Sequence, residues 1–283
     1  MKVYKEKIEL SKAIQALKDK NLMVGFVPTM GALHEGHLSL VQKAIGQNDK
    51  VVVSIFVNPT QFNNSSDLEK YPRTLEGDVE LLKTLENDAI IVFAPSVENI
   101  YDGETKAQKF DFDGLENEME GKYRSGHFDG VGTVVKRLFE IVKPHNAYFG
   151  EKDFQQLAII KKLVKKYELT VNVVGVDISR EPSGLARSSR NMRLKPEYKK
   201  ASPFIYKILK SAKEKFGIKS AGKIAEWVEN QFSKQELLEL EYFIIADSET
   251  LKPIKRKNKK KKYRAFIAAY ADDVRLIDNI ALN

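Results

Sequence analysis

Two of the four histidines in the chain, His34 and His37, lie three positions apart in a segment that glycines punctuate. An apolar run ends at Val27 just before this segment, and a helical pattern of apolar residues follows it. A turn between a strand and a helix is a natural anion site, because the first amides of the helix have no partners within it and the helix dipole favours negative charge. Imidazoles placed there can donate hydrogen bonds to phosphate oxygens, although two surface histidines would also fit the pattern.

Two further segments carry groups that suit a phosphate. Lys152 is a cation, and Asp153 beside it can cap a helix, contact a ribose hydroxyl or reach magnesium through water. Ser188, Ser189 and Arg190 offer two hydroxyls and a guanidinium. An N-cap followed by a solvent-facing arginine explains the same three residues, so both interpretations stay open at this point.

Two glutamines, Gln61 and Gln156, carry amides that both donate and accept hydrogen bonds. Such groups suit a substrate with hydroxyl and carboxylate groups, although either glutamine could be an ordinary polar surface residue. Arg124 and His127 lie in a glycine-punctuated segment, which is typical of either a lid over a cleft or a turn into the next helix.

The elements that must position these residues alternate along the chain. Apolar, β-branched runs at 22–27, 51–57, 89–93, 147–149 and 171–176 predict strands. Helical spacing predicts helices at 10–17, 38–45, 75–85, 131–142 and 154–166, with Thr74 and Asp153 as N-caps. The polar segment 101–128 is expected to be mostly irregular. This alternation predicts an α/β fold with a Rossmann-like parallel sheet and flanking helices.

The pattern changes after residue 176. Helices are expected at 198–215 and 221–232, followed by strands of a small antiparallel sheet at 241–246, 263–270 and 274–280. We therefore expect a nucleotide-binding Rossmann-like domain at 1–176 and a small C-terminal α+β lid domain at 177–283. Because open parallel sheets bind ligands beyond the carboxyl ends of their strands, the histidine segment and the segments that begin at residues 58, 150 and 180 should converge on one cleft.

The composition restricts the class of protein. A chain of 283 residues with 42% hydrophobic and 30% charged residues is globular. Zero cysteines exclude disulfides and thiolate metal sites, and four histidines without cysteine partners argue against structural zinc. The first residues have no apolar signal core, and no apolar run is long enough to span a bilayer, so we expect a soluble, cytoplasmic protein with no membrane partner.

The positive charge of the chain is local. Removing the seven positive charges of residues 255–262 from the formal net charge of +8 leaves +1. Such a run predicts a solvated hairpin loop, with a patch for RNA or acidic surfaces as the alternative. No nucleic-acid partner is expected; a nucleic-acid-binding protein would instead show an affinity that falls steeply with salt.

Six motifs follow one another in order within residues 22–194. They are PTMGALHEGH at 28–37, FVNPTQF at 56–62, YPR at 71–73, GHFDGV at 126–131, FGEKDFQQ at 149–156 and GLARSSRN at 184–191. This set resembles the pantothenate synthetase family, the pantoate-β-alanine ligases. The His-x-Gly-His element alone indicates only the wider nucleotidyltransferase group related to class I aminoacyl-tRNA synthetases. From residue 195 onward, the resemblance lies mainly in length and in the closing pattern VRLIDN at 274–279.

The resemblance implies an ATP-dependent, AMP-forming ligase of pantothenate and coenzyme A biosynthesis. Pantoate would react with ATP to give pantoyl adenylate and pyrophosphate, and β-alanine would then displace AMP to give pantothenate. Magnesium is expected to bridge the phosphates with few direct protein ligands, and the sequence assigns none. The resemblance also suggests a homodimer.

The resemblance further implies which residues bind each substrate. ATP would be bound by Met30, Gly31, Ala32, Leu33, His34, Glu35, Gly36, His37, Gly150, Glu151, Lys152, Asp153, Ser179, Arg187, Ser188, Ser189 and Arg190. Gln61 would contact pantoate and β-alanine, and Gln156 pantoate. His37 is the proton donor by resemblance, and His34 and Lys152 join it as catalytic residues that stabilise the departing pyrophosphate. The segment from Arg187 to Arg190 would act like the KMSKS loop of the related synthetases.

The chain departs from the family pattern at a few positions and leaves one enzymatic alternative. Ser179 replaces a small aliphatic residue, Ser125 a frequent proline, and Pro182-Ser183-Gly184 a stretch with an acidic residue before the glycine. The alternative is a nucleotidyltransferase that acts on a phosphate-bearing small molecule without a second step. The neutral amides of Gln61 and Gln156 argue against it, because a phosphorylated acceptor calls for more cations.

Overall fold

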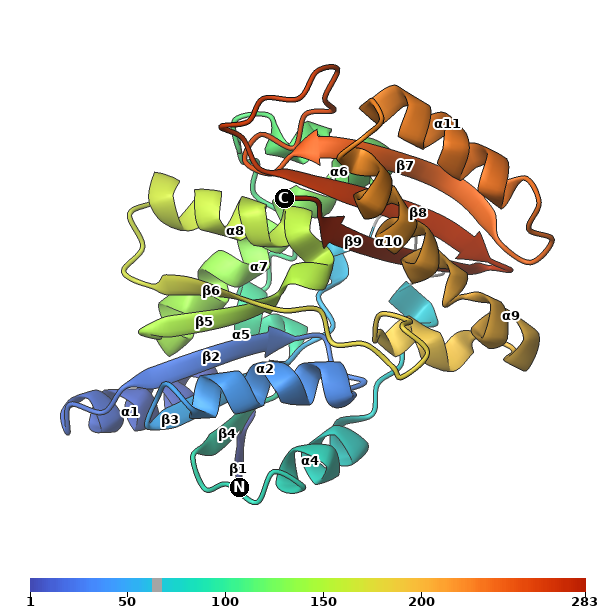
Figure 1. Ribbon diagram of the computed structural model, residues 1–283. Helices are drawn as coiled ribbons and strands as arrows, with labels where there is room; N and C mark the ends of the chain where they lie inside the picture. Colours follow the sequence, from blue (N-terminus) through green and yellow to red (C-terminus); the bar gives the residue numbers. More distant parts are fainter. Residues whose placement is uncertain (63–67) are drawn as a thin grey trace. The chain divides into compact units, whose positions relative to one another are not determined.

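The computed structural model describes residues 1–62 and 68–283, and the chain divides into two compact units (Figure 1). The first unit comprises Met1–Glu151 and Gln155–Asp177, and the second comprises Lys152–Phe154 and Ile178–Asn283. The sequence analysis assigns Lys152–Phe154 to the first domain, whereas the structure groups this segment with the second unit. Within that unit, the rings of Phe154 and Phe266 have centroids 5.8 Å apart, and Asn279 donates to the carbonyl of Lys152.

The first unit is built on a six-stranded parallel sheet with the order β1-β4-β3-β2-β5-β6. Its strands are β1 (Lys2–Tyr4), β2 (Val24–Thr29), β3 (Lys50–Ile55), β4 (Ile90–Phe93), β5 (Asn146–Gly150) and β6 (Asn172–Val176). Five of them coincide with the apolar runs, which confirms the predicted parallel sheet. The sequence analysis missed β1, because this three-residue edge strand buries only Tyr4.

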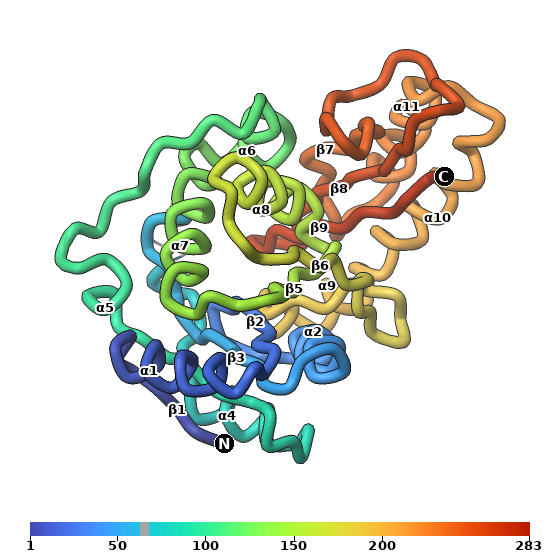
Figure 2. Tube along the Cα trace, turned by 90° about the vertical axis from the view of Figure 1, so that its left-hand side faces the viewer, coloured from blue at the N-terminus to red at the C-terminus, as the bar shows by residue number. Residues whose placement is uncertain are grey.

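Helices cover both faces of this sheet. The five long ones are α1 (Lys7–Lys18), α2 (Glu35–Ile45), α4 (Leu75–Lys83), α7 (His127–Val142) and α8 (Phe154–Lys166). Figure 2 shows α1 and α7 on one side of the sheet and α2 on the other. Strand alternation explains this arrangement, because Phe26 packs against Phe139 of α7, whereas the adjacent Val27 belongs to a core cluster with Val41 of α2 and Leu82 of α4.

The segment that was expected to be irregular contains short helical elements. They are a 3-10 turn (Leu115–Asn117) and α6 (Met119–Tyr123), and α7 begins at His127 rather than at residue 131. A further short helix, α5 (Val97–Tyr101), ends where the segment begins. Gln155 is buried and holds this segment in place. Its Oε1 accepts from the amide of Glu120 at 3.0 Å, and its Nε2 donates to the carbonyls of Leu115 and Glu118 at 2.8 and 2.7 Å.

The two expected N-caps occupy the starts of their helices in different ways. Thr74 stands at the N-cap position of α4, but its hydroxyl donates to Oδ1 of Asp78 at 3.1 Å instead of capping a backbone amide. Asp153 ends a 3-10 turn (Glu151–Asp153) directly before α8. Thr74 therefore supports Asp78, a buried carboxylate.

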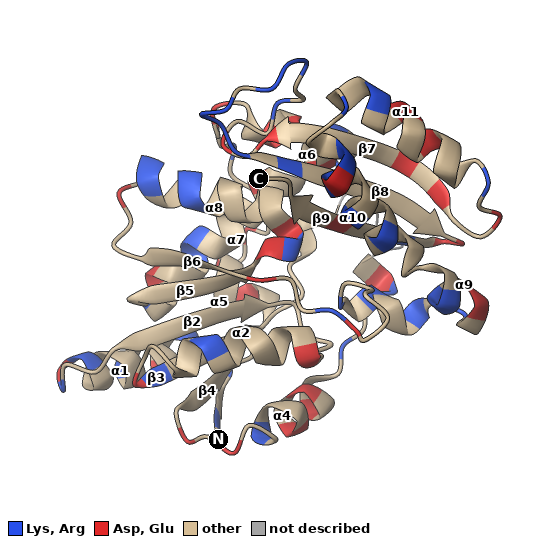
Figure 3. Ribbon diagram, in the orientation of Figure 1, with Lys and Arg blue, Asp and Glu red and all other residues tan. Residues whose placement is uncertain are grey.

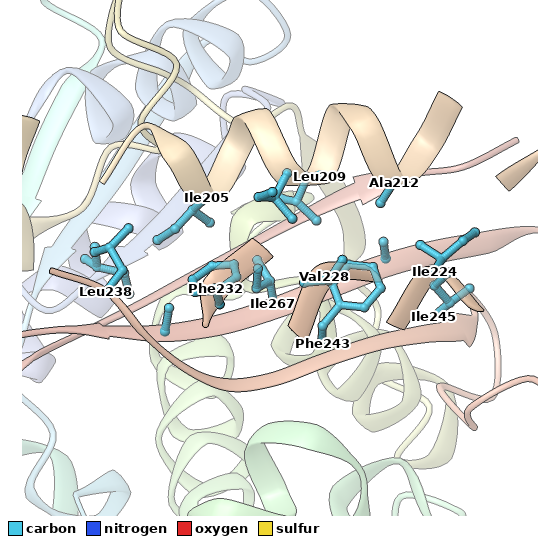
Figure 4. Packing of buried hydrophobic residues seen from close by; sticks show 14 of the residues in the cluster. Ile205, Leu209, Ala212, Ile224, Val228, Phe232, Leu238, Phe243, Ile245 and Ile267 are labelled. Atoms are coloured by element: carbon cyan, nitrogen blue, oxygen red, sulfur yellow. The ribbon is translucent and has the colours of Figure 1, made fainter. Parts of the chain in front are cut away.

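The second unit combines three helices with a three-stranded antiparallel sheet of order β7-β8-β9. Its elements are α9 (Pro196–Ala201), α10 (Phe204–Phe216), α11 (Ala221–Phe232), β7 (Glu239–Asp247), β8 (Tyr263–Ala271) and β9 (Val274–Ala281). The predicted antiparallel sheet is confirmed. The single helix expected at 198–215 is wrong, because Pro203 separates α9 from α10. Figure 4 shows Leu209 of α10 and Val228 of α11 packed with Phe243 and Ile267 of the sheet.

The basic run at 255–262 lies between β7 and β8, which pair as neighbouring antiparallel strands. All eight of its residues are exposed, and Figure 3 shows this connection as a mostly blue loop. The structure therefore has the predicted exposed hairpin loop at this position.

Candidate active site

The histidine segment begins where β2 ends. At β2, the order in which the chain adds strands to the sheet reverses. β2 pairs with β3 on one side and with β5 on the other, and the chain runs outward from β2 in both directions. Ligands of open parallel sheets bind beyond the carboxyl ends of the strands at such a switch point. The residues from Met30 to His37 follow β2, Gly150 is the last residue of β5, and Glu151 follows it.

The turn after β2 has an unusual backbone, which a buried carboxylate supports. Gly31 and Ala32 both have positive φ angles, of 83° and 49°. The amides of Ala32 and Leu33 donate to Oδ2 and Oδ1 of Asp78 at 3.0 and 2.8 Å, and Asp78 is 2% exposed. A Cβ at Gly31 would lie 3.0 Å from Oδ2 of Asp78 and 3.1 Å from Ile55, so a side chain there would crowd both. Asp78 thus fixes the path of the turn.

His34 and His37 cap α2 by a reciprocal pair of hydrogen bonds. The amide of Gly36 donates to Nδ1 of His34 at 3.0 Å, and the amide of His34 donates to Nδ1 of His37 at 3.3 Å. Because both Nδ1 atoms accept, the neutral form of each ring carries its proton on Nε2. The ring centroids are 4.1 Å apart. The capping bonds therefore give both imidazoles the same tautomer, with the proton on Nε2.

Gln61 follows β3 in a 3-10 turn (Pro59–Gln61), and its amide is oriented by a chain of buried polar groups. Asn58 donates from Nδ2 to Oε1 of Gln61 at 3.1 Å, and the hydroxyl of Tyr101 donates to Oδ1 of Asn58 at 2.6 Å. Burial raises the pKa of the Tyr101 hydroxyl, which keeps it protonated as the donor. On the other side, Nε2 of Gln61 donates to Sδ of Met30 at 2.8 Å. The structure thus brings two predicted site residues, Met30 and Gln61, together.

The segment of Arg124 and His127 also reaches this turn. Nδ1 of His127 donates to the backbone carbonyl of Gln61 at 2.8 Å, and Nη1 of Arg124 donates to Nε2 of His127 at 3.3 Å. A Cβ at Gly130 would lie 2.2 Å from the carbonyl oxygen of Thr60, so only glycine allows α7 to approach the turn this closely. Of the two interpretations of this segment, the structure shows the turn into α7.

Three predicted site residues lie around the start of α8. Gly150 is the last residue of β5, and Glu151 begins the following 3-10 turn. Gln156 is half-buried in the first turn of α8. Its neighbour Gln155 forms the hydrogen bonds that link the start of α8 to the backbone of the segment before α7.

In the second unit, the predicted ATP residues lie on a small hairpin and on the 3-10 turn that follows it. The amide of Arg187 donates to the carbonyl of Ser179 at 3.0 Å, so these residues are paired through their backbones. Ser188 accepts from the amide of Arg190 at 3.3 Å and caps the turn (Ser189–Arg193), which is the N-cap of the structural alternative, but Arg190 is half-buried and not the solvent-facing arginine of that alternative. Ser189 is buried.

Lys152 belongs to the same unit, and its Nζ lies 3.9 Å from Oδ1 of Asp153. Nearby, Arg180 forms a two-pronged ion pair with Asp278, a residue of β9. Burial raises the pKa of Asp278, and the guanidinium of Arg180 acts in the opposite direction. The convergence of the residues of both units on one cleft stays a prediction.

Three buried residues that support the site had no role in the sequence analysis: Asp78, Asn58 and Tyr101. Asp78 and Tyr101 contact residues more than forty positions away along the chain, so no local motif reveals them. A signal did exist for Asp78. Asp78 lies four positions before Leu82 on the buried side of α4, where an apolar residue is expected.

Two further properties concern metals and membranes. Among residues 1–62 and 68–283, no group of three or more His, Cys, Asp or Glu side chains is arranged to hold a metal ion. In the same part of the chain, no helix has the length and apolar character needed to cross a membrane.

The chain is similar to known proteins over its full length. A family model described as pantoate-beta-alanine ligase matches residues 2–281. Pantothenate synthetases from Christiangramia forsetii and Flavobacterium psychrophilum are 58% and 55% identical, with all of each chain covered. The crystal structure of pantothenate synthetase from Thermus thermophilus has a TM-score of 0.90 at 40% identity and covers 100% of this chain and 99% of its own.

A second solved structure is the pantoate-beta-alanine ligase from Francisella tularensis, complexed with beta-gamma ATP and β-alanine. It has a TM-score of 0.83 at 37% identity and covers 100% of this chain and 98% of its own. The six sequence motifs, the parallel sheet with its histidine-capped helix, and these full-length matches agree: the chain belongs to the pantoate-beta-alanine ligase family.

Proposed function

We propose that the protein condenses pantoate with β-alanine at the expense of ATP and releases pantothenate, AMP and pyrophosphate. The observation that carries this proposal is the full-length match to pantoate-beta-alanine ligases. The turn after β2 adds physical support, because two imidazoles with Nε2–H donors stand at the start of a helix, where anions bind.

In the first step, a carboxylate oxygen of pantoate attacks the α-phosphorus of ATP. The bond from that phosphorus to the bridging oxygen breaks, and pyrophosphate leaves with the electron pair. Charge therefore grows on the pyrophosphate, where His34, His37 and Lys152 act as hydrogen-bond donors and as a cation. We assign the remaining contacts with ATP to Met30–Glu35, Gly36, Gly150, Glu151, Asp153, Ser179 and Arg187–Arg190.

In the second step, the neutral amine of β-alanine attacks the acyl carbon of pantoyl adenylate. The bond from the acyl carbon to the phosphate oxygen breaks, AMP leaves with its electron pair, and the nitrogen loses a proton to solvent. We assign Gln61 to both pantoate and β-alanine and Gln156 to pantoate. The orientation of the Gln61 amide supports this assignment, since Asn58 holds its Oε1 and leaves Nε2 directed to the side of Met30.

We infer that ATP enters as its Mg²⁺ complex. Mg²⁺ keeps several waters and is commonly bound through substrate phosphates with one or two carboxylates. The described residues contain no preformed cluster of ligands, so we assign no protein ligand to it. From the family resemblance, we further infer a homodimer that works in the cytoplasm, with the second unit acting as a lid.

Exchange of labelled pyrophosphate into ATP tests the proposal. We expect exchange that requires pantoate and proceeds without β-alanine, and AMP with pantothenate as products when all three substrates are present. Exchange that is indifferent to pantoate would support the alternative, a nucleotidyltransferase acting on another acceptor. Formation of ADP would replace the adenylate with an acyl phosphate and refute the proposed route.

A further inference from the structure

Two adjacent polar residues of the C-terminal sheet, Asp278 and Asn279 on β9, are buried, with exposures of 4% and 2%. Successive residues of a strand face opposite sides of the sheet. Asp278 is paired in register with Ile267, which packs with α10 and α11, whereas Asn279 is paired with Phe266, which packs against Phe154. The two polar side chains therefore act on opposite faces of one sheet.

On the first face, Asp278 fixes Arg180. Nη1 and Nη2 of Arg180 donate to the two carboxylate oxygens of Asp278 at 2.6 and 2.9 Å, and the guanidinium lies 3.7 Å from the ring centroid of Tyr206. Nη1 also donates to the carbonyl of Gly184 at 3.1 Å. The backbone of Arg180 also pairs with Ala186 across the same hairpin, so the guanidinium holds the Gly184 side of the hairpin while the backbone of the same residue forms its base.

This hairpin leads directly into the residues assigned to ATP. The amide of Arg187 donates to the carbonyl of Ser179, one position before Arg180. The path of the chain into Ser188 and Arg190 therefore starts from a backbone that the Asp278 pair holds in place.

On the opposite face, Asn279 holds the backbone of Lys152. Its Nδ2 donates to the carbonyl of Lys152 at 2.9 Å. Arg264 donates to Oδ1 of Asn279, which orients the amide so that its nitrogen faces Lys152. The guanidinium of Arg264 lies 4.1 Å from the ring centroid of Phe154, so the same arginine also contacts the segment that carries Lys152.

We propose that Asp278 and Asn279 are positioning residues for ATP, because neighbouring side chains of β9 fix the two ATP-binding segments of the second unit. This inference rests on the proposed assignment of Lys152 and Arg187–Arg190 to ATP. It gives the closing motif VRLIDN a role: its last two residues set the distance and the orientation between a lysine and an arginine-containing turn.

Direct binding of ATP to the full-length chain, measured by calorimetry, tests the inference together with steady-state kinetics. We expect Asp278→Asn and Asn279→Ala each to weaken ATP binding and to raise the KM for ATP by about tenfold or more, with the KM for pantoate changed less than about twofold. Asp247→Asn is the matched control. Asp247 is also buried in this sheet, pairs with Lys261 at 2.7 Å and accepts from two turn amides.

A merely structural role predicts that all three variants lower the melting temperature and leave the ratio of the two KM values unchanged. That result would overturn the inference, as would equal weakening by Asp247→Asn. If Asp278→Asn does not fold, Asn279→Ala, which removes no charged group, decides the matter. Wild-type protein that binds ATP but shows no pantoate-dependent exchange would refute the proposed function, whereas ATP binding by the variants would still judge the positioning role.

Discussion

Replacing Asp78 by asparagine should reveal how strongly the turn after β2 depends on one buried carboxylate. Asp78 accepts the amides of Ala32 and Leu33 through separate oxygens, and asparagine offers only one oxygen. One of the two amides would then face an NH₂ group. A buried amide without a partner costs about 1–3 kcal/mol. In a protein of this size, each kcal/mol of lost stability lowers the melting temperature by about 2–4 °C. We therefore expect the melting temperature of Asp78→Asn to fall by several degrees.

The variant can escape part of this cost by moving the turn, and that movement should appear in ATP binding. Because about 1.4 kcal/mol is a factor of ten, a cost of ~1–3 kcal/mol corresponds to about a 5- to 150-fold loss of affinity. Calorimetric titration with ATP and thermal unfolding of the same samples measure both effects. Asp49→Asn is the control, since Asp49 accepts the amide of Met23 just before the opposite end of β2, at 2.7 Å. Wild-type ATP affinity in Asp78→Asn would refute the coupling between this carboxylate and the turn.

Three other changes test separate parts of the site. His37→Ala should lower turnover at least roughly 10²-fold with the fold intact, because the proposed donor to the departing pyrophosphate is lost. Tyr101→Phe removes the hydrogen bond that orients Asn58 and should lower kcat/KM for pantoate about tenfold, whereas Tyr148→Phe, which loses a hydroxyl bound to Asn48, should lower stability alone. Deleting 255–262 should leave pyrophosphate exchange unchanged, because the loop is exposed and its basic residues have no assigned role in the reaction.

Steady-state kinetics and circular dichroism test the histidine and tyrosine variants, and binding to RNA at increasing salt tests the loop deletion. Near-wild-type turnover of His37→Ala would remove that residue from the reaction. Equal kinetic effects of the two tyrosine variants would show that Tyr101 acts through stability only. RNA binding that falls steeply with salt and disappears with the loop would give the basic run a function of its own.

The parallel sheet could be predicted because its strands are continuous apolar runs separated by helical patterns, and the histidine turn because its glycines and imidazoles are adjacent in sequence. The elements between residues 101 and 128 could not, because the amide of Gln155 holds them from α8, more than thirty residues away. Gln155 lies four positions before the fully buried Ile159, on the inner side of its helix. Asp78 occupies the same kind of position on α4.

A polar residue on the apolar side of a helix is thus the sequence signal that was available for both Gln155 and Asp78. It marks a buried hydrogen bond to a distant segment, but it does not tell which segment. The break at Pro203 is different, since the proline itself was visible and favours a helix end or start over a continuous helix. The helical periodicity on either side concealed it.

The two imidazoles at the start of α2 cap the helix through Nδ1 and, in the proposed reaction, donate from Nε2–H, and this double use has a consequence for how the sequence can change. A descendant that no longer makes pantothenate would be released from the need for Nε2–H donors, but α2 would still need a cap. Selection for folding alone would then favour asparagine, aspartate or serine at position 34 and place little constraint on position 37. Relatives that have lost the reaction should therefore be recognisable by a good capping residue at 34 without histidine at 37.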